Sequence, residues 1–312
     1  MKNILIVDAS SYSQELERIL PSYQTDVCKT AFNAVSHLNS RGYDLVIAEV
    51  ELPGDNSFEF YYYMHKHFPY IPVIMMTGND MDTYFSEIMQ NGIGNVLNKP
   101  VDIGELQSLI TKLLHESPIF GLENYMEMIE DHKRIRITAS NQINTAINTM
   151  TSIIQDDWNF RIQNIMMSNL ILNEMIINAV YHAHGYTDYK LKRKQIKLPK
   201  DRWVDITFCH NTTEYAICIT DYMGTLTSKK ILESMYNVIY QKKAMDEALE
   251  NGRFDDIQIS ESGRGIELVR KLAKEYYFII HRNKRTDVIL KFDSSYEFET
   301  RETAAVKIIE RV

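Results

Sequence analysis

The chain has 312 residues, of which 45% are hydrophobic and 24% charged, and this predicts a globular protein of about two domains. Its net charge of −8 argues against a general nucleic-acid binder, which must neutralise phosphates. No apolar run reaches the roughly 18 residues that span a bilayer, and no signal-peptide pattern is seen. Cys28, Cys209 and Cys218 lack metal-ligand spacing and fit a reducing compartment. We therefore expect a cytoplasmic protein without a direct nucleic-acid or membrane partner.

The first part of the chain alternates short apolar runs with amphipathic segments. Strands are predicted at residues 4–7, 25–28, 45–48, 73–76 and 95–97, and helices at 11–20, 30–40, 57–67, 80–91 and 103–115. This alternation is typical of an α/β fold with a doubly wound, five-stranded parallel sheet. We assign it to a first domain, residues 1–117, whose working groups gather at the carboxyl ends of the strands.

The pattern loosens over residues 118–130, which we interpret as a linker, and then changes in a second domain, residues 131–312. Strands are predicted at 134–138, 204–209, 215–220, 276–282 and 287–292, and helices at 142–156, 160–184, 227–250 and 263–274. Clustered strands and helices favour an α+β two-layer sandwich. The charged segment 227–258 is interpreted either as a mobile lid over a ligand or as an ordinary surface helix.

Four segments of the first domain carry a family pattern: KNILIVDAS, YDLVIAEVELPG, IPVIMMTG and NVLNKPVD. Together they resemble the receiver domains of two-component response regulators. The resemblance implies a phosphoryl-transfer pocket at Asp8, Glu49, Thr77 and Lys99.

This pocket departs from the receiver pattern at two positions. Glu49 stands where receivers carry the aspartate that accepts the phosphoryl group, and Ala9 stands where a second acid would help to bind Mg²⁺. We therefore expect a pseudo-receiver used for interaction. Two alternatives stay open: a receiver that is still phosphorylated, and a Glu49 that mimics the phosphorylated state. We expect Lys99 to pair with Glu49 at any pH near neutrality, which would leave the pocket permanently charged.

Three segments of the second domain suggest a nucleotide pocket. In LILNEMIINAVYHAHG, Glu174, Asn178 and His182 recur every four residues and share one helix face. Asp221 ends a strand in ITDYMG. Gly263 and Gly265 in SGRGIELV flank the start of a helix, where backbone N–H groups can approach phosphate.

The order of these segments resembles the Bergerat-fold ATPases, and within that group the anti-sigma-factor serine kinases. The resemblance implies that Glu174 is the general base, that Asn178 is a Mg²⁺ ligand, and that Asp221 accepts the adenine amino group. It adds further ATP-binding positions at His182, Gly224, Gly263, Arg264, Gly265 and Thr286. Met223 stands where these proteins usually have glycine, and we expect its side chain to narrow the pocket.

The sequence thus predicts a bacterial signalling regulator in which a pseudo-receiver controls an ATP- and Mg²⁺-dependent serine/threonine kinase. Its expected partners are a small antagonist of the anti-anti-sigma type and a sigma factor, and a homodimer stays open. The alternative is a non-catalytic binding module whose shape depends on nucleotide, or that uses none. A histidine kinase is disfavoured because the only candidate phospho-acceptor, His132, leads straight into a predicted strand.

Overall fold

The computed structural model describes all residues except 55, 163–164, 252–263, 294–304 and 312. Its internal contacts divide the chain into two compact units, Met1–Ile119 with Glu302–Lys307 and Phe120–Arg301 with Ile308–Val312. Within the described residues, no helix is both long enough and apolar enough to cross a membrane.

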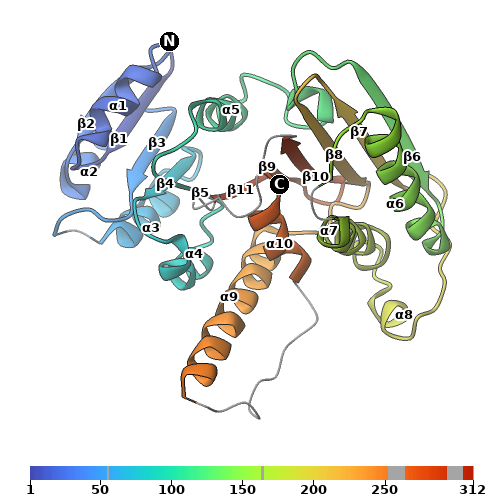
Figure 1. Ribbon diagram of the computed structural model, residues 1–312. Coiled ribbons are helices and arrows are strands. Elements are labelled where there is room, and N and C mark those ends of the chain that lie inside the picture. Colours follow the sequence, from blue (N-terminus) through green and yellow to red (C-terminus); the bar gives the residue numbers. More distant parts are fainter. Residues whose placement is uncertain (55, 163–164, 252–263, 294–304, 312) are drawn as a thin grey trace. The chain divides into compact units, whose positions relative to one another are not determined.

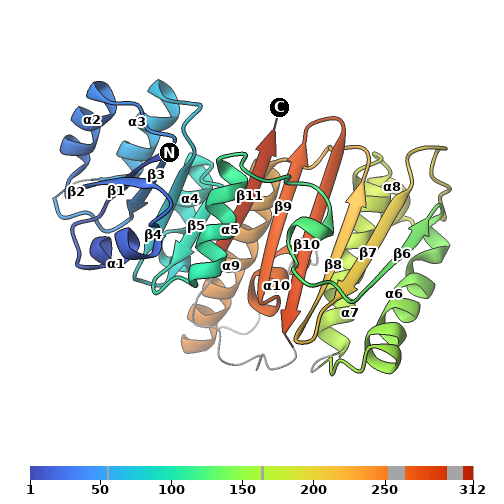
Figure 2. The same ribbon diagram turned by 90° about the horizontal axis from the view of Figure 1, so that it is seen from above.

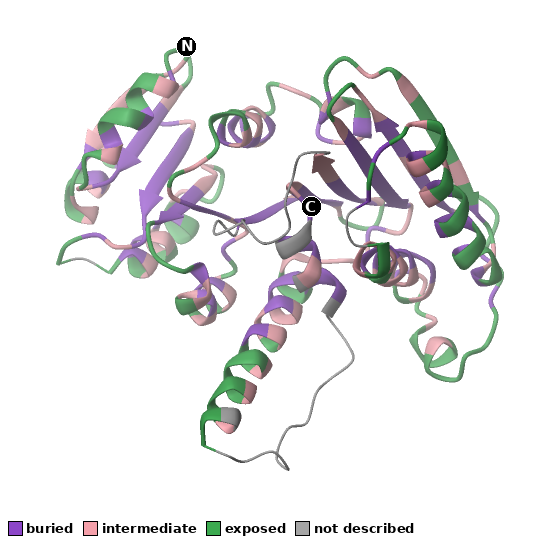
Figure 3. Cartoon of the chain, viewed as in Figure 1, coloured by how far each residue is buried: buried purple, intermediate pink, exposed green. Residues whose placement is uncertain are grey.

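The first unit contains the predicted five-stranded parallel sheet, in the order β2-β1-β3-β4-β5. Its strands are β1 (Asn3–Val7), β2 (Gln24–Cys28), β3 (Leu45–Glu49), β4 (Val73–Thr77) and β5 (Asn95–Asn98). Most residues of the central strands are buried (Figure 3), as expected for parallel strands covered on both faces. The receiver-like α/β fold is therefore confirmed.

Helices cover both faces of this sheet (Figure 1). They are α1 (Tyr12–Ile19), α2 (Ala31–Ser40), α3 (Ser57–His67), the short η1 (Met81–Thr83), α4 (Phe85–Asn91) and α5 (Ile103–Leu113). Four of these helices begin after a polar residue whose side chain accepts backbone N–H bonds of the first turn, namely Thr30, Asn56, Asp80 and Asp102. Such caps satisfy donors that the helix itself leaves unpaired, so they help to set where each helix begins.

The second unit contains a mixed sheet in the order β6-β7-β8-β10-β9-β11. Its strands are β6 (Asp131–Ile137), β7 (Val204–His210), β8 (Glu214–Asp221), β9 (Glu275–His281), β10 (Arg285–Asp293) and part of β11 (Ala305–Arg311). All pairs are antiparallel except β9 with β11.

The helices of this unit lie on one face of its sheet (Figure 2). They are η3 (Ser140–Gln142), α6 (Ile143–Ser152), η4 (Ile153–Asp157), α7 (Ile165–Ile177), η5 (Asn178–His182), α8 (Thr187–Leu191), α9 (Ser228–Glu250) and α10 (Arg264–Leu272). The other face is crossed by residues 120–130, which include η2 (Leu122–Asn124) and pack Tyr125 on Tyr277 with 4.8 Å between ring centroids.

Two elements differ from the sequence prediction. The pattern was expected to close at residue 292, but β11 follows. Its residues 305–307 pair with β5 in the first unit, and residues 308–311 pair with β9 in the second. The segment proposed as a lid or a surface helix forms α9 over residues 228–250, with Ile231, Leu232 and Met235 buried, while residues 252–258 lie outside the described part.

Candidate functional site

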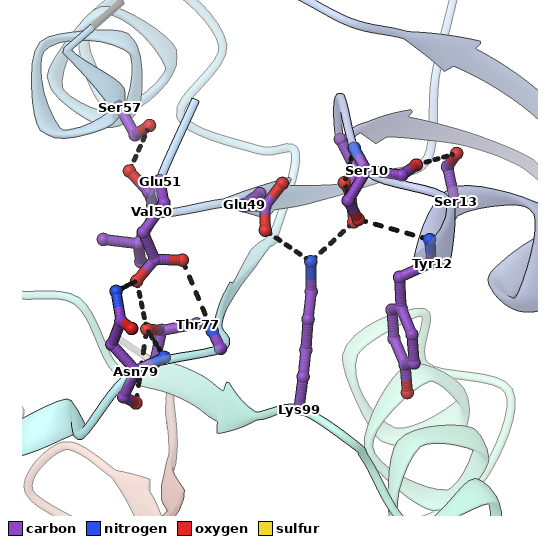
Figure 4. A network of polar contacts seen from close by, with 12 residues as sticks. Ser10, Tyr12, Ser13, Glu49, Val50, Glu51, Ser57, Thr77, Asn79 and Lys99 are labelled. Carbon is purple, nitrogen blue, oxygen red and sulfur yellow. Dashed lines mark hydrogen bonds and ion pairs between the residues drawn. The ribbon is translucent and has the colours of Figure 1, made fainter. Parts of the chain in front are cut away.

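The carboxyl edge of the first sheet brings together the four residues expected in the receiver pocket. Asp8 follows β1, Glu49 ends β3, Thr77 ends β4 and Lys99 follows β5. The Lys99 ammonium donates to Asp8 Oδ2 at 2.7 Å and to Glu49 Oε1 at 2.6 Å (Figure 4). The three side chains are largely buried, with 2% of Asp8 and 11% of Lys99 and Glu49 exposed. They form one compact ionic cluster.

This cluster already contains a cation. The Lys99 ammonium lies between the two carboxylates that a divalent ion would need as ligands, and Ala9 offers no third side-chain oxygen. Mg²⁺ requires several oxygen ligands in near-octahedral geometry. The residues at this edge therefore do not fit a bound Mg²⁺, and we derive no step through a metal here.

The charge of the cluster changes near neutral pH. Burial raises the pKa of Glu49 to about 7, assisted by the neighbouring Asp8 and opposed by Lys99. Burial also acts to raise the pKa of Asp8, but hydrogen bonds with Glu49, Lys99 and Ser10 outweigh it and lower that pKa. The expected Lys99–Glu49 pair is present. The raised pKa of Glu49 argues against a permanently charged pocket, and the charge state near neutral pH stays a prediction.

Glu51 is a further member of the pocket that the sequence reasoning missed. Its carboxylate accepts hydrogen bonds from the Thr77 hydroxyl, from the Gly78 N–H at 3.3 Å and from the Asn79 side-chain amide at 3.3 Å (Figure 4). The Asn79 N–H in turn donates to Thr77 Oγ1 at 3.0 Å. The donors that could hold an incoming anion are thus engaged by a carboxylate of the chain itself. The available signal was a second acid two residues after Glu49.

The second unit contains a cavity of about 310 Å³ that gathers most of the residues predicted there. Those that line it are Glu174, Asn178, His182, Asp221, Gly265 and Thr286. Gly263 lies outside the described residues, and the side chain of Arg264, the first residue of α10, is also not described. Gly224 and Met223 are not among the described residues that line the cavity. The expectation that Met223 narrows the pocket is therefore wrong for the described cavity wall.

The sheet side of the cavity combines apolar side chains with one polar pair. Ile219, Phe278 and Val288 line it together with Asp221 and Thr286, which lie opposite each other on β8 and β10. Asp221 Oδ1 accepts the N–H groups of Met223 and Gly224, each at 2.9 Å. Burial raises the pKa of Asp221 in spite of these bonds.

The polar atoms of this pair are incompletely satisfied. No hydrogen bond to Asp221 Oδ2 occurs among the described residues. The Thr286 hydroxyl is 1% exposed and lies close enough to favour the ionised form of Asp221, but it makes no well-formed hydrogen bond. Buried polar groups usually have partners, so this pair points to a ligand.

The helix side of the cavity carries Glu174, Asn178 and His182. Glu174 lies on α7, and the other two lie on the π-helical turn η5, in which the Ala183 N–H donates to the Asn178 carbonyl at 2.9 Å. The sequence predicted an uninterrupted helix here. Single π-helical turns often occur at functional sites. Here the turn keeps both side chains on the cavity wall.

The two described glycines of the predicted set have packing roles. A Cβ on Gly265 would lie 2.4 Å from the Glu174 Cβ, so glycine allows α10 to approach α7 closely. Gly224 has a φ of +60°, and a Cβ there would lie 2.3 Å from the His281 carbonyl oxygen and 2.6 Å from the Lys284 nitrogen. Gly224 therefore supports the turn that donates to Asp221, and it does not line the cavity.

Lys230 and Ser234 of α9 also line the cavity, although the sequence reasoning did not include them. Burial lowers the pKa of His182, and the positive charges of Lys190 and Lys230 lower it further. In a long charged helix no sequence signal separates Lys230 from its neighbours, because packing alone decides which lysine faces the cavity.

Comparison with known proteins settles the identity of the first unit. The family described as "Response regulator receiver domain" matches residues 4–111. This part of the chain is a receiver domain. The receiver domain of an HD domain-containing protein from Pseudomonas fluorescens is 28% identical, covering 37% of this chain and 88% of that one, with a TM-score of 0.35. A receiver domain protein from Methanospirillum hungatei is 25% identical over 37% of this chain and 95% of that one, also at 0.35.

Curated relatives match part of this chain. "Two-component response regulator-like PRR1" of rice is 29% identical over 49% of this chain and 31% of its own length. "Transcription factor SKN7" of Candida albicans is 26% identical over 36% of this chain and 20% of its own length. This chain thus spans at most about a third of these relatives. It is a response-regulator-like signalling protein, and relatives from a plant and a yeast give no support to the expected bacterial source.

Proposed function

We propose that the receiver domain controls an ATP-binding domain similar to the anti-sigma-factor serine kinases. The observation that carries this proposal is the cavity of the second unit. An apolar wall holds the incompletely satisfied pair Asp221 and Thr286, and the opposite wall holds Glu174 and Asn178. Such a cavity suits a ligand with a flat, amine-bearing ring at one end and a reactive polar group at the other.

The sheet side of the cavity fits adenine. The free oxygen of Asp221 can accept a hydrogen bond from the exocyclic amine, and the Thr286 hydroxyl can pair with a ring nitrogen or a bridging water. Ile219 and Val288 supply apolar contact for the ring. The raised pKa of Asp221 supports this arrangement, because a buried carboxylate without all its donors is stabilised by a ligand that donates.

The helix side of the cavity fits the catalytic roles. The Asn178 side-chain oxygen would be a ligand of Mg²⁺, which when bound with ATP offsets charge on the transferring phosphoryl group. Glu174 would take the proton from the attacking serine or threonine hydroxyl of an antagonist protein. Asp221 would hold the adenine, so that the γ-phosphoryl end is directed toward Glu174.

Calorimetry of the wild-type chain with ADP and Mg²⁺ tests the binding step of this proposal. We expect saturable binding, and no heat of binding at millimolar nucleotide would contradict it. Incubation with γ-labelled ATP and the antagonist protein tests the transfer step. Label on a serine or threonine of the antagonist supports the kinase, whereas binding without transfer supports the non-catalytic module.

We also propose that the receiver domain acts without aspartyl phosphorylation, as a docking or dimerising surface. The Lys99 bridge and the Glu51–Thr77 contact occupy the groups that phosphorylation would use. Incubation with acetyl phosphate and Mg²⁺, followed by intact mass measurement, should show no added phosphoryl group. Stoichiometric labelling would show that the pocket still performs receiver chemistry.

The proposal also includes a location and partners. The cytoplasm suits the three cysteines, all of which are free and buried. An anti-anti-sigma-like antagonist and a sigma factor are the proposed partners, with a homodimer as the proposed assembly. A pull-down with the intact chain followed by mass spectrometry tests the partners.

A further inference from the structure

Helix α9 presents two polar side chains to the cavity, the exposed Lys230 and the half-buried Ser234. Lys230 and Ser234 are one turn apart and line the same cavity, so they share a helix face. The adjoining face carries Ile231, Leu232 and Met235, all of which are fully buried. Burial of these side chains fixes the rotation of the helix about its axis, and so it fixes which lysine faces the cavity.

The first turn of α9 is also anchored to the sheet. Glu310 accepts hydrogen bonds at Oε2 from the Ser228 hydroxyl and from the Ser228 N–H, the latter at 3.0 Å. At Oε1 it accepts a bond from Arg282 Nε at 2.6 Å. Burial acts to raise the pKa of Glu310, but these bonds outweigh it and lower that pKa. The backbone two residues before Lys230 is therefore held in place.

The ammonium of Lys230 makes no ion pair with any described residue. Its neighbour Lys229 pairs with Glu233 at 3.8 Å, whereas Lys230 pairs with neither Glu233 nor the cavity carboxylate Glu174. Lys230 is close enough to His182 to disfavour a second positive charge there. Lys230 is exposed and lines the cavity, and a cation without an ion pair in the described part of the chain is placed there to receive an anionic ligand.

We propose that Lys230 binds the phosphate end of the ligand and makes the cavity selective for a nucleotide over its nucleoside. This inference rests on the proposed nucleotide function and deepens it. Asp221 and Thr286 recognise the ring, while Lys230 recognises the charge. Ser234, one turn further along α9, lies on the same wall as a hydroxyl for a phosphate oxygen. Glu310 is a positioning residue, because it acts on the ligand only through α9.

Calorimetry on the full chain with Mg²⁺ tests the proposal, with ADP and adenosine as separate ligands. The variants are Lys230→Met, Lys230→Arg and the matched control Lys229→Met, which removes an exposed charge one residue away. We expect Lys230→Met to weaken ADP binding by about tenfold to a hundredfold, the range for a contact with a charged group. Adenosine affinity should stay the same. Lys230→Arg should retain most of the ADP affinity, and Lys229→Met should match wild type.

The outcomes separate the inference from the function on which it rests. If the wild-type chain binds neither ADP nor adenosine, the nucleotide function fails and the inference fails with it. If it binds both equally well, or if Lys230→Met and Lys229→Met bind ADP equally, the nucleotide function stands and the role of Lys230 is wrong. An equal loss of ADP and adenosine in Lys230→Met would also contradict the proposal, because it would mean that Lys230 supports the fold of the cavity.

Discussion

The two pockets of this molecule differ in how their polar groups are paired. In the receiver pocket, Lys99 bridges Asp8 and Glu49, and Glu51 takes the Thr77 hydroxyl, so the chain supplies both the cation and the anion. In the second-unit cavity, Thr286 has no hydrogen-bond partner and Lys230 has no ion-pair partner within the described part of the chain. The charged groups of the first pocket are therefore paired with one another, although Asn98 Oδ1 beside Lys99 is buried without a hydrogen bond among the described residues. The second cavity leaves the Thr286 hydroxyl and the Lys230 ammonium without such pairs in the described part of the chain.

A match to the receiver family therefore does not by itself show that the chemistry of that family is retained. The first unit matches the receiver family and retains Thr77 and Lys99, yet its groups are already engaged. The second unit has a buried hydroxyl, that of Thr286, without a well-formed hydrogen bond, and a ligand that paired with it would offset its desolvation cost. The pairing of polar groups within the chain, together with their residue types, therefore helps to indicate where a ligand is to be sought.

The largest expected effect is on phosphoryl transfer in the second-unit cavity. If the second unit is a kinase, Glu174→Ala should reduce phosphoryl transfer by roughly 10²–10⁴-fold, the scale for loss of a general base. ADP affinity should hardly change, because in the proposed arrangement Glu174 acts on the attacking hydroxyl and Asp221 holds the ring. Single-turnover assays with labelled ATP, alongside calorimetry with ADP, measure both quantities. Unchanged transfer would place the base elsewhere.

Replacement of the lysine in each pocket, Lys99 or Lys230, should change the unfolding free energy by different amounts. Lys99→Met leaves Asp8 and Glu49 facing each other without their cation, and we expect a loss of about 2–4 kcal/mol in unfolding free energy, because Glu49 offsets part of the cost by taking up a proton. Lys230→Met should leave the unfolding free energy as in wild type, since Lys230 is exposed and makes no ion pair with the residues that the structure describes. Urea unfolding of the full chain, followed separately in each unit by pulse proteolysis, provides the measurement. Equal unfolding free energies of Lys99→Met and Lys230→Met would contradict the difference between the two pockets.

The adenine contact should produce an intermediate effect. Asp221→Asn replaces a charged acceptor with a neutral amide, and we expect ADP binding to weaken by about 1–3 kcal/mol, typical of a hydrogen bond to a buried charged group. Calorimetry with ADP and adenosine should show the same loss for both ligands, unlike Lys230→Met. An Asn variant that binds as tightly as wild type would remove Asp221 from the ring site.

The smallest expected effect concerns pH and the receiver pocket. The pKa of Glu49 is raised from 4.5 to about 7, so the folded state holds a proton that the unfolded state has already lost between these values. Its stabilising contribution is complete below pH 4.5 and disappears as the pH rises through about 7. Asp8 has the opposite shift, which acts only at lower pH.

We therefore expect the first unit to lose about 1–2 kcal/mol between pH 5 and pH 8, after allowance for screening. Glu49→Gln should remove this slope. Carbon-detected NMR of the Glu49 carboxyl, together with unfolding at both pH values, checks the prediction. An ordinary carboxyl titration near pH 4.5 would contradict it.

Much of the first unit could be predicted from the sequence because most of its strands are short apolar runs that lead to a polar residue. Asp8, Glu49, Thr77 and Lys99 follow such runs, and parallel topology brings strand ends to one edge. The Glu51–Thr77 contact could not be predicted, since it depends on how a loop side chain turns back toward the sheet.

The elements that were missed depend on contacts distant in sequence. β11 carries Lys307 in the middle of an apolar segment, which weakens the strand pattern. In the fold that lysine is fully buried and paired with Glu105 at 2.5 Å, a residue 202 positions earlier. Lys230 was missed for a related reason, because the burial of Ile231 and Met235 against the rest of the second unit selects the helix face that lines the cavity.

A single NMR experiment on the full chain tests the central claim. According to this claim, the charged groups of the receiver pocket pair with one another, whereas the second-unit cavity binds a ligand. Amide resonances of Gly78 and Asn79 report on the first, and those of Met223 and Gly224 report on the second. We predict that beryllium fluoride with Mg²⁺ leaves Gly78 and Asn79 unmoved, and that ADP with Mg²⁺ then shifts Met223 and Gly224 in a saturable manner. Saturable shifts of Gly78 and Asn79 with beryllium fluoride, and none of Met223 and Gly224 with ADP, would contradict the account.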